Sequence, residues 1–152
     1  MDQPHLEFVT ELRVHVAAPL EIGHLAEGHR RIVEILGGEF TGPLLHGAIK
    51  PGGADWQLIR SDNVAVLDAR YTLLTDSGFT IYVSNQGIRY AEAPVMARLL
   101  RGEHVNSNEY YFYPTPSFET DAPALQWLRH SIFIGKGTRL PNLVVIQVWR
   151  VG

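Results

Sequence analysis

The chain has 152 residues, of which 45% are hydrophobic and 19% charged, and this balance predicts a globular protein with a single domain over residues 1–152. The net charge is −3 and no segment concentrates basic residues, which argues against nucleic acid or an anionic membrane surface as a partner. The chain has no cysteine, which excludes disulfides, thiolate metal sites and cysteine nucleophiles.

The first residues, MDQPHLEFVTELRV, lack the basic start and apolar core of a signal peptide. No apolar run approaches the roughly 18 residues that cross a bilayer. We therefore expect a cytoplasmic protein without a membrane partner.

Alternation of apolar and polar residues with period two dominates the chain and predicts strands. A short helix is predicted over 94–102, where Pro94 suits the start and Gly102 the end. The predicted strands are 6–16, 29–36 (ending at Gly37-Gly38), 44–49, 64–74, 79–85, 131–137 and 142–151.

This pattern predicts an all-β fold, a small antiparallel β-barrel with one short helix, because closure removes exposed sheet edges. A two-sheet sandwich is the alternative, and periodicity does not separate the two. With only one helix to cover the outer wall, a homodimer through that wall is expected.

The segment 64–85 reads as a hairpin around TDSG. A loop of two or four residues would place Arg70 and Asn85 on one face, and Tyr71 and Tyr82 on the other. If the first face points inward, Arg70 anchors a ligand in a pocket. Otherwise Asp68 and Arg70 form a surface ion pair.

The stretch KPGGADWQ places Asp55 directly before Trp56, with Gln57 on the same strand face as Asp55. Asp55 either accepts hydrogen bonds in a turn or is a carboxyl group held against apolar walls. In the second case desolvation raises its pKa and suits it to acid–base chemistry.

Metal and nucleotide signatures are missing. The seven histidines include no His-x-His or His-Glu-x-x-His pair, and no phosphate-binding glycine loop is present. We therefore expect neither a metal nor another cofactor. The aromatic segment 109–120 reads as a loop over a barrel end or as a ligand-stacking wall.

The motifs GPLLHGAIKPGGADWQ, LDARYTLLTDSGFTIYVSNQGIR, EYYFYPTPSFET and WLRHSIFIGKGTR appear in this order over nearly the whole chain. Through these four motifs the chain resembles the domain of unknown function 3237 family, also called uncharacterised protein family 0311. The resemblance implies a small barrel similar in shape to allene oxide cyclase and dirigent barrels, with no established activity. It favours a pocket position for Asp55. The chain has Tyr113 where family members usually carry arginine, and Arg129 where they often carry asparagine.

The first functional hypothesis is a cofactor-free lyase, isomerase or cyclase acting on a small organic molecule in the barrel cavity. The alternatives are a carrier or sensor that does not turn its ligand over, and a structural module with a filled barrel. The predicted catalytic residues are Asp55, Tyr82 and Tyr111. The predicted substrate-binding residues are Trp56, Arg70, Tyr71, Asn85, Arg89, Glu119 and Arg129.

Overall fold

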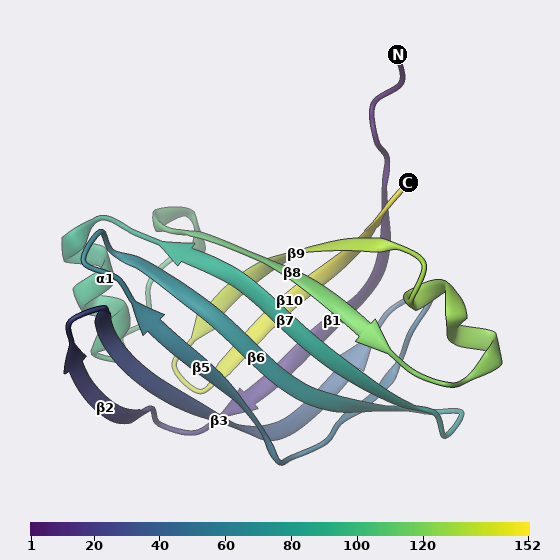
Figure 1. The fold of residues 1–152 in the computed structure, drawn as a ribbon, viewed down its shortest axis with the longest axis horizontal. Coiled ribbons are helices and arrows are strands. Elements are labelled where there is room, and N and C mark those ends of the chain that lie inside the picture. The colour runs from purple at the N-terminus through teal and green to yellow at the C-terminus, as the bar shows by residue number, and fades with distance from the viewer.

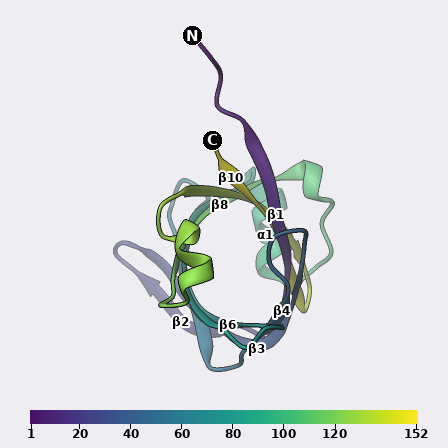
Figure 2. The same ribbon diagram turned by 90° about the vertical axis from the view of Figure 1, so that its right-hand side faces the viewer.

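The computed structural model describes residues 1–152 and shows an antiparallel, barrel-like sheet with one short α-helix. Figure 2 shows the strands arranged around a common axis, and the N-terminal tail extends away from them. The predicted fold class is confirmed. The strands are β1 (Leu6–Val16), β2 (Leu20–Leu25), β3 (Gly28–Thr41), β4 (Gly47–Ile49), β5 (Gly53–Ile59), β6 (Val64–Thr75), β7 (Thr80–Tyr90), β8 (Tyr111–Glu119), β9 (Ile132–Leu140) and β10 (Leu143–Val151).

The sheet order is β8-β7-β6-β4-β3-β1-β10-β9, with β5 between β3 and β6 and β2 on β3. The long strand β3 serves several partners: its first half pairs with β5 and its second half with β1 and β4. We expected this strand to end at Gly37-Gly38, but it continues to Thr41. Gly38 has φ +150° and a Cβ there would lie 2.0 Å from the Arg13 carbonyl oxygen, so glycine allows β3 to pass close to β1 and continue.

The helix α1 (Ala93–Leu100) forms where the sequence predicts it. Met96 and Leu99 are buried on its inner side, and Gly102 at φ +80° follows its last turn. Two short 3-10 helices, η1 (Ser107–Glu109) and η2 (Pro123–Leu128), lie before and after β8.

The segment 109–120, interpreted above as a loop or a wall, is mostly the barrel strand β8. Pro114 and Pro116 have no backbone N–H to donate. Because backbone groups alternate in direction along a strand, both missing donors lie on the same edge of β8. The other side of β8 pairs with β7, and no ladder joins β8 to β9.

Side-chain packing closes this β8–β9 seam instead. A Cβ at Gly135 would lie 2.8 Å from Pro114 Cγ, and one at Gly137 would lie 2.5 Å from the Phe112 ring. The ring and the proline therefore lie directly against glycine backbone. The main core lies on the inner face of the sheet toward the η2 end, and it includes Val9, Leu12, Phe40, Leu73, Ile81, Phe118 and Phe133.

Candidate functional site

The turn of the β6–β7 hairpin decides which side chains enter the barrel. Thr75 and Phe79 form a backbone hydrogen bond (N to O, 2.8 Å) that closes a loop of three residues, with Gly78 at φ +94°. Ala69 therefore lies opposite Asn85, and Tyr71 opposite Val83. The odd-numbered residues of both strands face inward.

This register corrects the predicted face of Arg70. An even-length loop was expected, but Asp-Ser-Gly supplies three residues, so Arg70 lies opposite Ser84 and not with Asn85. The Arg70 side chain is 51% exposed, and its Nε lies 3.4 Å from Asp68 Oδ1. The alternative prediction, a surface ion pair, is the one that the structure confirms.

A cavity of about 60 Å³ occupies the lumen beside this hairpin and opens to solvent. Most of its wall is apolar, and the polar side chains come from three strands: Asp55 and Gln57 from β5, Tyr71 from β6, and Asn85 and Arg89 from β7. The apolar lining comprises Val14, Val16, Val33, Ile35, Leu67, Ala69, Phe112, Pro114, Val144 and Ile146.

Asp55 lies between β3 and β6, opposite Val33 on one side and Ala69 on the other. Its Oδ1 accepts a 2.9 Å hydrogen bond from the Asp68 backbone N–H, and its Oδ2 accepts one of 2.9 Å from Gln57 Nε2. The residue as a whole is half-buried, but protein atoms surround the carboxyl group. Desolvation raises the pKa of Asp55, although both hydrogen bonds and the nearby Arg89 act in the opposite direction.

Tyr71 and Asn85 are neighbouring buried side chains, each 3% exposed. The Tyr71 hydroxyl and Asn85 Oδ1 have no hydrogen-bond partner. Burial raises the pKa of Tyr71, and the Asn85 side chain partly offsets this rise. The hydroxyl therefore stays protonated at neutral pH. Because buried polar atoms are normally paired, these two atoms are available to a ligand.

Arg89 is 4% exposed and lies with its guanidinium 5.7 Å from the centroid of the Phe112 ring. Its Nε has no hydrogen-bond partner. Desolvation lowers the pKa of Arg89 to about 10, and repulsion from Arg139 contributes to the shift, while Asp55 opposes it. The side chain is still a cation at neutral pH.

The structure brings together four of the predicted site residues, namely Asp55, Tyr71, Asn85 and Arg89. It places the other six on the outer surface or at the barrel rim, away from the lumen cavity. These are Trp56, Arg70, Tyr82, Tyr111, Glu119 and Arg129.

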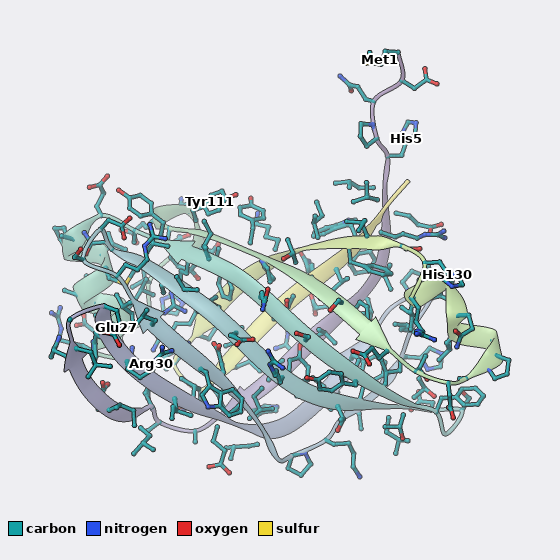
Figure 3. The ribbon with its side chains drawn as sticks, viewed as in Figure 1. Met1, His5, Glu27, Arg30, Tyr111 and His130 are labelled. Atoms are coloured by element: carbon teal, nitrogen blue, oxygen red, sulfur yellow. The ribbon has the colours of Figure 1, made fainter.

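Alternation along the strands accounts for most of these outer positions. Trp56 is 43% exposed because its neighbours Asp55 and Gln57 point inward. Tyr111 and Glu119 are exposed positions of β8, whose even-numbered residues are buried, and Figure 3 shows Tyr111 pointing away from the barrel. Tyr82 pairs with Thr72 and Glu119 on the outer face. Arg129 follows η2, where its Nη1 donates to Gln126 Oε1 at 3.4 Å.

Three polar side chains near the cavity were not predicted. Gln57 shares the strand face of Asp55, and that periodicity alone could have identified it. Arg31 shares a face with Val33 and lies in a neighbouring cavity with Arg139. Only the strand order brings β3 and β9 to the same end of the lumen. The sequence positions of Arg31 and Arg139 therefore do not reveal that these two residues are neighbours.

The structure gathers no group of three or more His, Cys, Asp or Glu side chains that could hold a metal ion. None of its helices has the length and apolar character needed to cross a lipid bilayer.

Comparison with known proteins places the chain in a family. The family model described as protein of unknown function (DUF3237) matches residues 4–151. A UPF0311 protein of Rhodopseudomonas palustris is 39% identical over 150 residues, covering 97% of this chain and 98% of the relative. A UPF0311 protein of Clostridium acetobutylicum is 34% identical over 146 residues, covering 95% of this chain and 92% of the relative.

Solved structures agree with this placement. A conserved protein of unknown function from R. palustris superimposes with a TM-score of 0.93 at 36% identity, covering 100% of this chain and 99% of the other. A β-barrel-like protein from Acinetobacter baumannii gives 0.86 at 35% identity, covering 100% and 98%. An enzyme from Penicillium herquei shares the fold with a TM-score of 0.75 at 18% identity, covering 100% and 97%. The resemblance inferred from the sequence motifs is therefore confirmed, and the chain belongs to the DUF3237 family, whose curated relatives are named UPF0311 proteins.

Proposed function

We propose that the lumen binds a small, mainly apolar organic molecule and converts it by proton transfer, as a lyase, isomerase or cyclase. One observation carries the proposal. A carboxyl group with a raised pKa, that of Asp55, lines the same apolar cavity as two buried polar atoms without partners, Tyr71 Oη and Asn85 Oδ1. Groups with perturbed pKa values in an apolar pocket are typical of acid–base catalysis.

Each of the three groups has a distinct role in the proposal. Asp55 gives or takes the proton, since desolvation shifts its pKa toward neutral pH. Tyr71 donates a hydrogen bond to a ligand oxygen, and Asn85 Oδ1 accepts one from a ligand hydroxyl. The apolar walls exclude water and so strengthen these contacts. The Penicillium herquei protein of the same fold is described as an enzyme, which is consistent with catalysis in a barrel of this kind.

A carrier or sensor is the second candidate, and one observation favours it. Both carboxyl oxygens of Asp55 already accept hydrogen bonds within the chain, as they would in a purely structural role. A structural module with a filled barrel has less support, because the lumen keeps an open cavity.

The experiment begins with small aromatic and alicyclic ketones, enols and keto acids, screened for binding by amide chemical shifts of lumen residues. Molecules that bind are then incubated with the protein in D₂O, and deuterium incorporation and product formation are followed by NMR. We expect exchange or conversion that falls about 100-fold or more in Asp55→Asn.

Glu119→Gln is the matched control, because Glu119 is an exposed acid on the outer face of β8 and its loss should leave the rate unchanged. Conversion that Asp55→Asn retains would remove Asp55 from the reaction. Bound molecules that never react would identify the barrel as a carrier.

The outer wall also supports a homodimer. Tyr111 and Tyr113 pack together with ring centroids 4.5 Å apart, and both are exposed. Exposed Ile88 and Tyr90 on the neighbouring strand β7 continue the apolar surface. We expect light scattering to give twice the chain mass of 17.0 kDa at micromolar concentration, and Tyr113→Glu to lower it. The monomer mass in the unaltered protein would contradict the dimer.

A further inference from the structure

Three arginines gather at one end of the lumen. Arg31 on β3, Arg89 on β7 and Arg139 on β9 line a second cavity, of about 40 Å³. Arg89 and Gln57 line both this cavity and the lumen cavity, so the two spaces are neighbours that share a wall. Arg31 and Arg89 are each only 4% exposed.

These three cations have few anionic partners. Arg31 Nε lies 3.0 Å from Glu21 Oε1, but the same carboxylate also contacts His29, at 2.5 Å from Oε2 to Nε2. Arg89 forms no salt bridge, and its Nε has no hydrogen-bond partner. Arg139 donates from Nη1 to the Glu103 carbonyl oxygen at 3.0 Å, which neutralises no charge.

A buried charge without a partner is costly, and an anion beside the buried Arg89 would offset that cost. Repulsion among the three is visible in the lowered pKa values of Arg89 and Arg139, for which desolvation is the larger cause. Guanidinium groups suit carboxylates in particular, because their forked N–H donors match two oxygens at once.

We propose that Arg31, Arg89 and Arg139 form an anion subsite, and that the ligand is an organic acid whose carboxylate lies there while its apolar body occupies the lumen. The inference deepens the proposed function and rests on it for the position of the body. It also places the ligand's reactive part among Asp55, Tyr71 and Asn85, on the other side of Arg89 and Gln57 from the carboxylate.

A matched pair of probes tests the subsite: trans-cinnamate, and trans-cinnamamide, which has the same apolar body without the charge. Binding is measured by isothermal titration calorimetry and by amide chemical shifts. We expect cinnamate to bind about tenfold or more tighter than cinnamamide, as charged hydrogen bonds predict. Arg89→Met should remove most of this preference by weakening cinnamate binding much more than cinnamamide binding.

Arg70→Met is the control, because Arg70 lies on the same hairpin but faces solvent, and it should keep the preference. If Arg89→Met does not fold, the half-buried Arg139→Met provides the same comparison. Equal responses to the acid and the amide, including no response to either, would overturn the subsite.

A lumen-blocking variant separates this inference from the proposed function. Ala69 lines the lumen cavity, and Ala69→Phe should abolish cinnamate binding if the ring enters the lumen. The milder Ala69→Leu serves if the larger side chain prevents folding. Cinnamate binding that still depends on Arg89 but survives both substitutions would retain the subsite and refute ligand binding in the lumen.

Discussion

Gln57 Nε2 donates a 2.9 Å hydrogen bond to Asp55 Oδ2, and the two side chains lie two residues apart on one face of β5. This bond stabilises the ionised carboxylate and so lowers the pKa of Asp55, against the larger effect of desolvation. Gln57 thus adjusts the group that we place at the centre of the chemistry.

The first prediction follows from this bond. Gln57→Leu removes a donor to the ionised form and leaves desolvation in place, so the pKa of Asp55 should rise further. The measurement is a pH titration of the Asp55 side-chain carboxyl carbon by NMR. Gln86→Leu, an exposed glutamine on β7, is the control and should leave the titration unchanged. A midpoint that stays the same or falls in Gln57→Leu would show that the bond does not act on the carboxylate.

The second prediction concerns the Tyr71 hydroxyl, which is buried and has no hydrogen-bond partner. Tyr71→Phe removes this group and its contact with the Asn85 side chain, so the free energy of unfolding should change by less than about 1 kcal/mol. Ligand binding or turnover should fall. Urea denaturation measures the first effect, and Tyr113→Phe, an exposed tyrosine, is the control for both. A clear loss of stability would mean that the hydroxyl is already paired in the fold.

Much of the fold follows from local patterns in the sequence. Alternation predicted most strands, and the proline and glycine around 94–102 predicted the helix α1 correctly. The aromatic segment 109–120 was harder, because Pro114 and Pro116 resemble loop residues. They are compatible with β8 only because no ladder forms between β8 and β9.

The candidate site depended on a smaller detail, the length of one turn. A change of one residue in the β6–β7 loop changes which residues of the two strands share a face, which is why Arg70 and Asn85 were expected on one face and lie on opposite faces. Asp55 and Asn85 were found nonetheless, through the motif that carries Asp55 and through the family resemblance. The cluster of Arg31, Arg89 and Arg139 needed the strand order itself.

The third prediction tests the seam between β8 and β9. A Cβ at Gly137 would lie 2.5 Å from the Phe112 ring, so Gly137→Ala forces the ring to move. We expect the free energy of unfolding to fall by about 1–3 kcal/mol, as in other overpacked sites. In Phe112→Leu the side chain is smaller, and there the same alanine should cost about 1 kcal/mol less. Additive effects in this double-mutant cycle, measured in urea, would show that Phe112 does not close the seam.

The fourth prediction is the pH dependence of stability that Asp55 imposes. Its pKa in the folded chain is raised above the ordinary value of 3.8, so the folded state holds the proton more tightly than the unfolded state. Between these two pKa values stability therefore falls as pH rises, and above the folded pKa the loss is complete. Asn at this position cannot ionise and retains the capacity to pair with Gln57 and the Asp68 N–H.

Asp55→Asn should accordingly match the unaltered protein near pH 3 and gain on it as pH rises, so that it is equally or more stable at pH 7. The gain amounts to about 1.4 kcal/mol for each pKa unit of the shift. Urea denaturation across pH 3–8 measures this difference, with Glu119→Gln, an exposed acid of β8, as the control. The control should change stability by less than about 1 kcal/mol at any pH. If Asp55→Asn instead loses more than about 1 kcal/mol at pH 7 and binds the same ligands, Asp55 is a structural acceptor for Gln57 and Asp68, and the acid–base role fails.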